Sequence, residues 1–242
     1  MQMSFELLEY IQRPKAERQM IMDELKHYAE QCEKCPELVK SRALYPFGKP
    51  TFGYGDINSP LFFIGEAPGM YGCGTTGIPF TKDKSGEYFT KMLREALGLT
   101  HDDIWITNAV KCCPENNRTP TEVERSNCLQ FLATELKLVK PFVVVTMGMS
   151  ATKMFFPGLE QFFKVHGRNM TLGDEVGGIS GIPWFKLCQH KAFILPIWHP
   201  SFVMRDTTHL EQRYRREFKA IERLLNYAYS LWGRPQKGIE VI

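Results

Sequence analysis

The sequence predicts an α/β fold of three layers, α/β/α, around a central and mainly parallel sheet of four strands. Two observations lead to this prediction. Short apolar runs rich in β-branched and aromatic residues recur along the chain, as expected for strands buried on both faces. Helical patterns separate these runs, and such alternation of strand and helix is typical of a parallel sheet with helices on both faces.

The expected strands are four apolar runs. Three of them, at 61–64, 104–107 and 142–146, consist almost entirely of β-branched, aromatic and leucine residues. The fourth, at 192–197, contains Pro196, which favours a sheet edge or a strand end because proline cannot donate a hydrogen bond to a neighbouring strand.

The expected helices lie at about 85–98, 120–139, 148–156 and 207–232. The last helix has apolar residues spaced three and four apart, which predict its core-facing side: Leu210, Tyr214, Phe218, Ile221 and Leu225. Its basic residues predict a solvated face, with DNA contact as the less favoured alternative: Arg213, Arg215, Arg216 and Lys219.

Length and composition predict a single domain over residues 1–242, with N-terminal helices at about 1–30 and a loose tail at about 233–242. The net charge of +3 permits nucleic-acid binding without requiring it. The sequence lacks a secretory signal pattern and an apolar run of membrane-spanning length. We therefore expect a monomeric intracellular protein of the cytoplasm or nucleoid, with no membrane partner.

Polar residues gather where the expected strands end. The first strand runs into Gly65-Glu66-Ala67-Pro68-Gly69, the second ends at Asn108, and the fourth is followed by His199. Ligands of open parallel sheets bind at the carboxyl ends of the strands. Taken singly, Asn108 could be a capping residue and His199 a structural one, but a carboxylate, an amide and a histidine together predict a site that binds a polar planar ligand and acts on it.

Four motifs in order carry a family resemblance: GEAPG, PFTKDKSG, TNAVKC followed by PENNRTP, and WHPS. Over about residues 30–230 the chain resembles the iron–sulfur uracil-DNA glycosylases, the families numbered four and five. The resemblance implies a base-excision-repair enzyme that hydrolyses the N-glycosidic bond of uracil, or of another deaminated base, flipped out of DNA. It also implies a monofunctional enzyme with water as the nucleophile, although Lys82 and Lys84 leave a Schiff-base route open.

The resemblance assigns a role to each motif. Phe80 would stack on the base, with a core aromatic as the alternative, and Asn108 would read the Watson–Crick edge. His199 would donate a hydrogen bond to the departing base. Gly65 and Ala67 would complete the substrate pocket.

Two acids compete for the role of the catalytic carboxylate. Resemblance to family five favours Asp83, whereas resemblance to family four favours Glu66. We expect Asp83 to be the main carboxylate and Glu66 to orient its loop or contribute to the pocket. The stretch Gly72-Cys73-Gly74 lacks the acid that blocks the thymine methyl group in family four, which leaves the base range open.

The loop after His199 resembles the segment that enters the DNA duplex in these families. The residues expected to contact DNA are Ser201, Met204 and Arg205, and Phe202 is either a wedge or a packed side chain. Lys111, Arg118 and Lys164 are further candidates for phosphate contacts.

Four cysteines are candidate metal ligands: Cys32, Cys35, Cys112 and Cys128. Their spacing alone fits zinc or an iron–sulfur cluster equally well. The resemblance favours a [4Fe–4S] cluster, with Cys113 as a bystander or alternative ligand and Cys73 and Cys188 as free thiols. The remaining alternative is an iron–sulfur protein that binds nucleic acid or transfers electrons without glycosylase chemistry, but Asn108 and His199 weigh against it.

Overall fold

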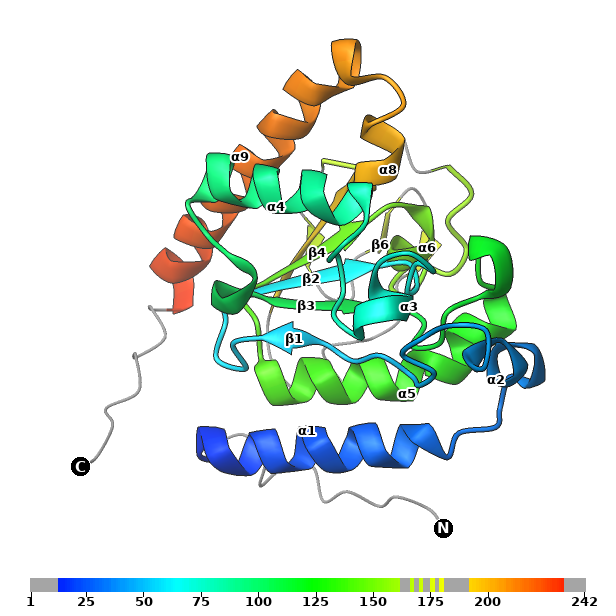
Figure 1. Ribbon diagram of the computed structural model, residues 1–242. Helices are drawn as coiled ribbons and strands as arrows, with labels where there is room; N and C mark the ends of the chain where they lie inside the picture. Colours follow the sequence, from blue (N-terminus) through cyan, green and yellow to red (C-terminus); the bar gives the residue numbers. More distant parts are fainter. Residues whose placement is uncertain are drawn as a thin grey trace.

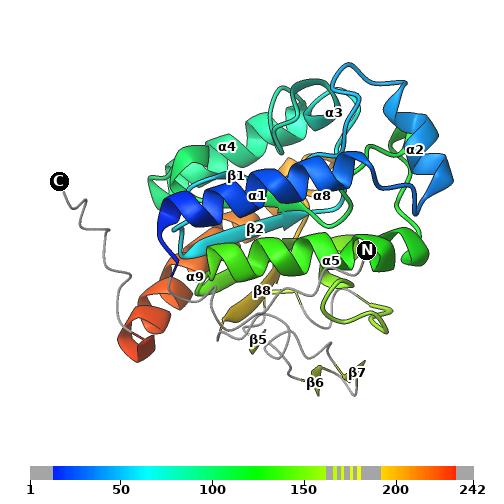
Figure 2. The ribbon, with the colours of Figure 1, turned by 90° about the horizontal axis from the view of Figure 1, so that it is seen from below.

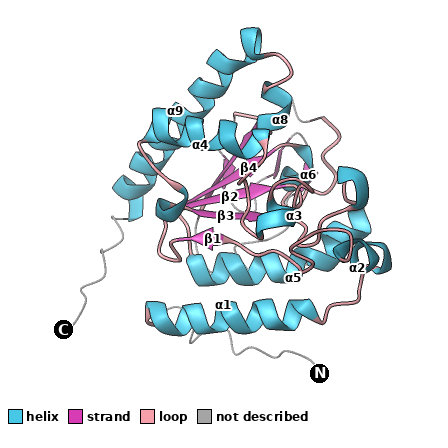
Figure 3. Cartoon of the chain, in the orientation of Figure 1, coloured by secondary structure: helices cyan, strands magenta, loops and turns pink. Residues whose placement is uncertain are grey.

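The structure, a computed structural model, confirms the predicted fold class: a mixed sheet lies between layers of helices (Figure 3). It describes residues 13–161, 166–167, 170–171, 175–176, 179–180 and 192–232. The tail at 233–242, the first part of the expected N-terminal helices, Lys164 and Cys188 lie outside the described residues.

The central sheet has six strands in the order β1-β3-β2-β4-β8-β5. Their bounds are Tyr54–Gly55 (β1), Leu61–Gly65 (β2), Trp105–Asn108 (β3), Val143–Met147 (β4), Met170–Thr171 (β5) and Phe193–Ile197 (β8). The four predicted strands are its parallel centre, whereas β1 and β5 are antiparallel edges. These edges escaped prediction because two residues are too short to carry a periodic pattern. A separate pair joins β6 (Glu175–Val176) and β7 (Ile179–Ser180).

The parallel strands are buried along their whole length, which explains their continuous apolar runs. Pro196 lies opposite Thr146 of β4. Strand β5 pairs with Phe193 and Ile194, so Pro196 lies past these positions, where its carbonyl accepts from the Gly167 amide at 2.7 Å. This position fits the absence of a proline N–H.

Helices cover both faces of the sheet (Figure 1). Helices α4 (Lys84–Leu97) and α9 (Thr207–Trp232) cover one face, and α5 (Glu122–Val139) covers the other with α1 (Lys15–Glu30) packed outside it (Figure 2). Helix α4 ends as predicted at Gly98, which adopts a left-handed φ of 67°.

The predicted helix at 148–156 is wrong in length, because α6 spans only Met149–Thr152. Tight turns follow it, in which Met154 and Phe155 donate to carbonyls three residues earlier. These turns bury Phe155 and Phe156, each 1% exposed, in the core. The apolar content of this stretch therefore reflects burial of a turn and not a longer helix.

Helix α9 has the predicted two faces. Tyr214, Phe218 and Ile221 are fully buried. Arg215 pairs with Glu95 of α4 at 2.8 Å and with Glu211 at 2.8 Å, and the neighbouring basic side chains Arg213, Arg216 and Lys219 are exposed. The described helices include none that is long and apolar enough to cross a membrane.

Short helices gather at the carboxyl ends of the parallel strands (Figure 1). They are α2 (Pro36–Arg42), α3 (Cys73–Thr76) and α8 (Pro200–Val203). Two 3-10 turns, His101–Asp103 and Glu115–Asn117, connect larger elements. The loops that carry the sequence motifs thus meet at one end of the sheet.

Candidate functional site

A cavity of about 240 Å³ opens at this end of the sheet. Seven of the predicted site residues line it: Glu66, Ala67, Phe80, Asp83, Asn108, His199 and Ser201. Its wall also includes Cys73, Asn117 and Arg118. Loops that follow β2, β3 and β8 therefore form one site, as the positions of the motifs at the strand ends predict.

Gly65 leaves the space that the side chains of Phe80 and Asn108 occupy. It is paired with Asn108 in the parallel register of β2 and β3. A Cβ atom at position 65 would lie 2.4 Å from Asn108 Oδ1 and 2.6 Å from Phe80 Cε2. Only glycine leaves room for both side chains, so Gly65 contributes to the site through the absence of a side chain.

Phe80 has an unusual backbone conformation, with φ at +54°. Such a φ is uncommon for a bulky residue and is strained. Its ring packs on Phe89 at 5.2 Å and on His199 at 5.7 Å between centroids. Phe80 thus belongs to the hydrophobic core and also lines the cavity. Its position is compatible with both predicted roles, a core aromatic and a ring that stacks on the base.

Asp83 is the N-cap of α4, and its Oδ1 accepts a hydrogen bond of 2.7 Å from the Gly86 amide. The other oxygen faces the glycine loop, because a Cβ at Gly72 would lie 2.4 Å from Oδ2. Helix capping fixes one oxygen of this carboxylate. The second oxygen is then held at the cavity wall.

The carboxyl group of Glu66 is largely shielded from solvent. Burial raises the pKa of its carboxyl group, and a hydrogen bond from Thr119 and the positive charge of Arg125 partly oppose this shift. Its Oε1 is buried and has no hydrogen-bond partner within the described residues. Glu66 therefore has a weaker tendency than an exposed acid to carry a negative charge.

His199 is neutral at physiological pH. Burial lowers its pKa to about 4, and the charge of Arg205 acts in the same direction. The ring Nδ1 accepts from the Ser201 amide at 3.2 Å and lies 2.8 Å from Ser201 Oγ. A proton on the ring must therefore reside on Nε2, which makes Nε2 a hydrogen-bond donor.

The prediction of Lys111 as a phosphate contact is wrong. Its side chain is 1% exposed and forms an ion pair with Glu135 of α5, which is fully buried. Lys111 follows β3 in a turn that directs its side chain inward. The sequence could not reveal this, because the acidic partner lies 24 residues further along the chain.

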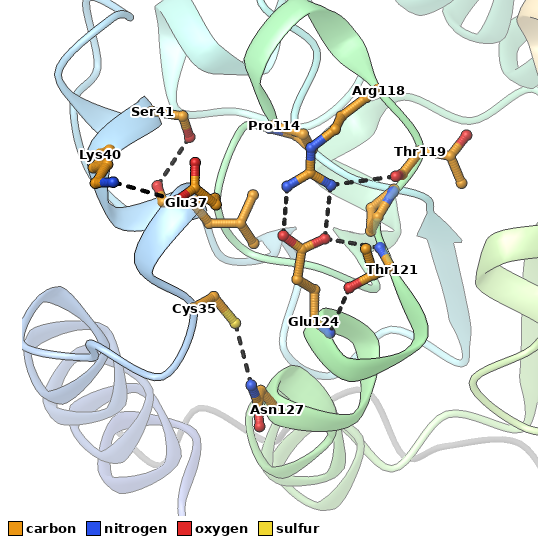
Figure 4. A network of polar contacts seen from close by, with 12 residues as sticks. Cys35, Glu37, Lys40, Ser41, Pro114, Arg118, Thr119, Thr121, Glu124 and Asn127 are labelled. Carbon is orange, nitrogen blue, oxygen red and sulfur yellow. Dashed lines mark hydrogen bonds and ion pairs between the residues drawn. The ribbon is translucent and has the colours of Figure 1, made fainter.

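Arg118 lines the cavity while its guanidinium forms two bonds with Glu124, one of them 2.8 Å from Nη1 (Figure 4). Glu124 also completes a capping box with Thr121 at the start of α5. Asn117, which the sequence analysis missed, accepts from the Met70 amide at 2.8 Å and has φ at +53°. Two consecutive asparagines, which tolerate this conformation, were the available signal.

Comparison with known proteins matches residues 52–223 to the uracil DNA glycosylase superfamily. This chain belongs to that superfamily. It is 31% identical over 190 residues to a type-4 uracil-DNA glycosylase of Thermotoga maritima, covering 78% of this chain and 86% of the relative. A type-4 enzyme of Saccharolobus solfataricus is 29% identical over 227 residues, covering 90% and 97%.

A type-5 uracil-DNA glycosylase of Pyrobaculum aerophilum is 34% identical over 139 residues, covering 48% of this chain and 61% of the relative. Similarity to both types confirms the predicted mosaic of families four and five. The predicted DNA-repair glycosylase function is confirmed at the level of this superfamily.

The four predicted ligand cysteines of this superfamily member line one small cavity of about 20 Å³. Arg42 donates to Cys112 Sγ at 3.4 Å from Nε and 3.3 Å from Nη2. Asn127 donates to Cys35 Sγ at 3.3 Å (Figure 4). The described residues contain no group of three or more histidine, cysteine or acidic side chains close enough to hold a single metal ion.

The remaining cysteines of the described chain lie elsewhere. Cys73 lines the cavity at the carboxyl ends of the strands, and burial raises the pKa of its thiol to about 12. Cys113 lies beside Gly74, where a Cβ would be 3.2 Å from its Sγ. Neither Cys73 nor Cys113 lines the cavity formed by the four predicted ligand cysteines.

The predicted DNA-contacting loop begins in α8. Phe202 is 38% exposed and stacks on Trp198 at 4.5 Å between centroids. Met204 is half-buried and Arg205 is exposed. Ser201, placed in the DNA group by the sequence, contacts His199 and lies in the cavity wall.

Proposed function

We propose that the chain removes uracil from DNA by hydrolysing the bond between the base and its deoxyribose. The observation that carries this proposal is the convergence of Phe80, Asn108 and His199 on one cavity beside Gly65. An aromatic face, an amide and a neutral donor are the groups that a site for a planar, polar base requires.

The target base would enter this cavity after it rotates out of the helix. Phe80 offers its ring face for stacking. The side-chain amide of Asn108 has one acceptor and one donor group, which match the N3–H and O4 of uracil. Cytosine presents the opposite pattern at these positions, so Asn108 disfavours it.

Cleavage breaks the C1′–N1 bond, and the electron pair leaves with the uracil ring. His199 Nε2–H is the donor that stabilises this negative charge. A water molecule then forms the new bond to C1′, and Asp83 orients the water and accepts its proton. The carboxylate also stabilises the positive charge that develops on the sugar.

Glu66 acts as a positioning residue in this scheme. Its backbone oxygen accepts from the Val110 amide at 3.1 Å, which ties the first motif to the loop after Asn108. The raised pKa of its carboxyl group makes Glu66 less suited than Asp83 to stabilise a cation.

The base range depends on the stretch from Gly72 to Gly74. Cys73 is the side chain that this stretch contributes to the cavity wall, and its thiol is uncharged at neutral pH. A neutral thiol excludes larger bases less strongly than a carboxylate would. We therefore expect activity on other deaminated bases, with uracil as the preferred substrate.

We propose a [4Fe–4S] cluster as the resident cofactor, held by Cys32, Cys35, Cys112 and Cys128. The donor set fits: four thiols share one cavity, and Arg42 and Asn127 donate to sulfur atoms. Zinc, which four thiolates can also hold, is the alternative occupant. The cluster would join the N-terminal segment to the loop after β3.

The DNA-facing surface would be the loop that follows His199. Phe202 and Met204 offer apolar groups for the space left by the flipped base, and Arg205 offers a charge for a phosphate. Arg118, at the cavity wall, is a second candidate phosphate contact.

The test is incubation of the protein with an oligonucleotide that contains one uracil, followed by measurement of free uracil and strand breaks. We expect release of uracil, with strand scission only after treatment with alkali. Scission without alkali would refute the monofunctional mechanism. DNA binding with no released base would favour the non-catalytic iron–sulfur alternative.

A further inference from the structure

Lys111 and Glu135 form a buried polar cluster directly behind Asn108. Lys111 Nζ donates to the Asn108 carbonyl at 2.8 Å, to Thr107 Oγ1 at 2.9 Å and to the Glu135 carboxylate. The two charged side chains are 1% and 0% exposed. This cluster has no access to DNA, and the chemistry described above does not use it.

Glu135 anchors the cluster to the helical layer. Its Oε1 accepts from the Gly53 amide at 2.7 Å, and both its oxygens accept from the Thr107 hydroxyl, at 3.0 and 3.1 Å. Lys111 Nζ also lies 5.4 Å from the ring centroid of Phe52. The cluster thus links the end of β3 to α5 and to the segment before β1.

The backbone around Asn108 is held from two sides. On one side, the Ala109 amide donates to Gly65 at 2.9 Å and the Val110 amide donates to Glu66 at 3.1 Å. On the other side, Lys111 Nζ holds the Asn108 carbonyl. These bonds fix the backbone at Asn108, and with it the direction in which the side chain leaves the strand.

A buried ion pair is a poor way to gain stability, because desolvation offsets the attraction between the charges. Apolar side chains of similar volume would pack equally well. Only a cation on a long stem, however, can donate to the Asn108 carbonyl, the Thr107 hydroxyl and a carboxylate at once. The three hydrogen bonds of Lys111 therefore explain why this buried position holds a charged pair. Packing alone would not require charged side chains here.

We infer that the buried Lys111–Glu135 pair is the positioning element that fixes Asn108 for recognition of the flipped base. This inference rests on the proposed function. Lys111 acts through Asn108 and does not touch the substrate. Removal of the pair should therefore lower kcat/KM only in a protein that still has Asn108.

The experiment is a mutant cycle on kcat/KM for uracil-containing DNA. The Lys111→Met/Glu135→Gln variant removes both charges and keeps an acceptor for Gly53. We expect it to lower kcat/KM at least about ten-fold in the wild-type background, but by less than about two-fold in the Asn108→Ala background. Equal losses in both backgrounds, or no loss in the first, would overturn the inference.

Thr107→Val is a milder variant that keeps the test decisive if the double variant does not fold. Its matched control is Thr146→Val in β4, which breaks a buried 2.8 Å bond to Thr152 of α6 and does not touch Asn108. We expect a loss for Thr107→Val that depends on Asn108, and none for the control. Equal effects of the two valine variants would overturn the inference, whereas absence of uracil release by the wild type would refute the proposed function instead.

Discussion

Gly65 and Asn108 face each other at the ends of two parallel strands, and a single methyl group on Gly65 would lie 2.4 Å from the Asn108 side-chain oxygen. The same methyl group would lie 2.6 Å from the Phe80 ring. The cavity therefore exists because a strand ends on a residue without a side chain. The sequence alone places this glycine in a motif, but its partners come from two other segments.

The substitution Gly65→Ala should lower kcat/KM at least about 100-fold, because the displaced Asn108 and Phe80 lose the geometry that the flipped base requires. The graded control is Gly69→Ala, whose Cβ would meet only Asp83 Oδ2 at 3.2 Å. Steady-state kinetics on uracil-containing DNA measures both. A loss at Gly69 as large as that at Gly65 would contradict this explanation.

Asp83→Asn should reduce kcat about 100-fold or more with little change in stability. Asparagine caps helices about as well as aspartate, so the bond from Gly86 persists while the negative charge is lost. Glu66→Gln should cost much less activity. Single-turnover rates and thermal unfolding separate these effects, and the reverse ranking would make Glu66 the main carboxylate.

His199 should act as a neutral donor across the physiological range. Its folded-state pKa of about 4 means that protonation of this ring begins well below pH 6. We expect NMR of the imidazole to show a proton on Nε2 at pH 7 and no titration near pH 6.5. His199→Ala should lower kcat about 100-fold, and a ring that titrates at 6.5 would exclude a neutral donor.

Glu217 of α9 should make the stability of the fold depend on pH. Its carboxyl group accepts from the Trp198 amide at 3.2 Å and lies 3.8 Å from His166 Nε2. Burial raises the pKa of the Glu217 carboxyl group from 4.5 to about 7. The hydrogen bond from Trp198 and the charge of Arg213 oppose this shift. Between these values the native state holds a proton that the unfolded chain has released, so stability falls as pH rises from 4.5 to 7.

The Glu217→Gln variant should remove this contribution and retain an acceptor for Trp198. Above pH 7 it should be more stable than the wild type, by an amount on the order of 1–3 kcal/mol. Urea unfolding at pH 5 and pH 8 measures the difference. Parallel pH profiles for the two proteins would show that Glu217 does not carry this dependence.

Bound iron should distinguish the proposed ligands from neighbouring thiols. Cys112→Ser should abolish visible absorption and reduce iron content. Cys113→Ser should keep the absorption and the iron content of the wild type, because Cys113 does not line the cavity of the four proposed ligands. Iron analysis and the absorption spectrum of purified protein provide the measurement. Equal loss in both variants would place Cys113 among the ligands.

The sequence predicted the central strands, the main helices and half of the residues that line the cavity, because burial and motifs leave local patterns. It could not predict the inward direction of Lys111, whose partner Glu135 is distant in sequence and close only in the fold. Ser201 contacts His199 through its amide and hydroxyl and lies in the cavity wall, and its role in DNA contact stays a prediction. The error at Lys111 arises because a tertiary contact, and not residue type, decides which way its side chain points.

The central claim is that Asn108 reads the flipped base, and free-base analysis of an Asn108→Asp variant tests it most directly. Aspartate has only acceptors, which match the amino group of cytosine and no longer match uracil. The account predicts that the wild type releases uracil and not cytosine, and that the variant loses most uracil release and gains measurable release of mispaired cytosine. A variant that releases uracil at the wild-type rate would contradict the account.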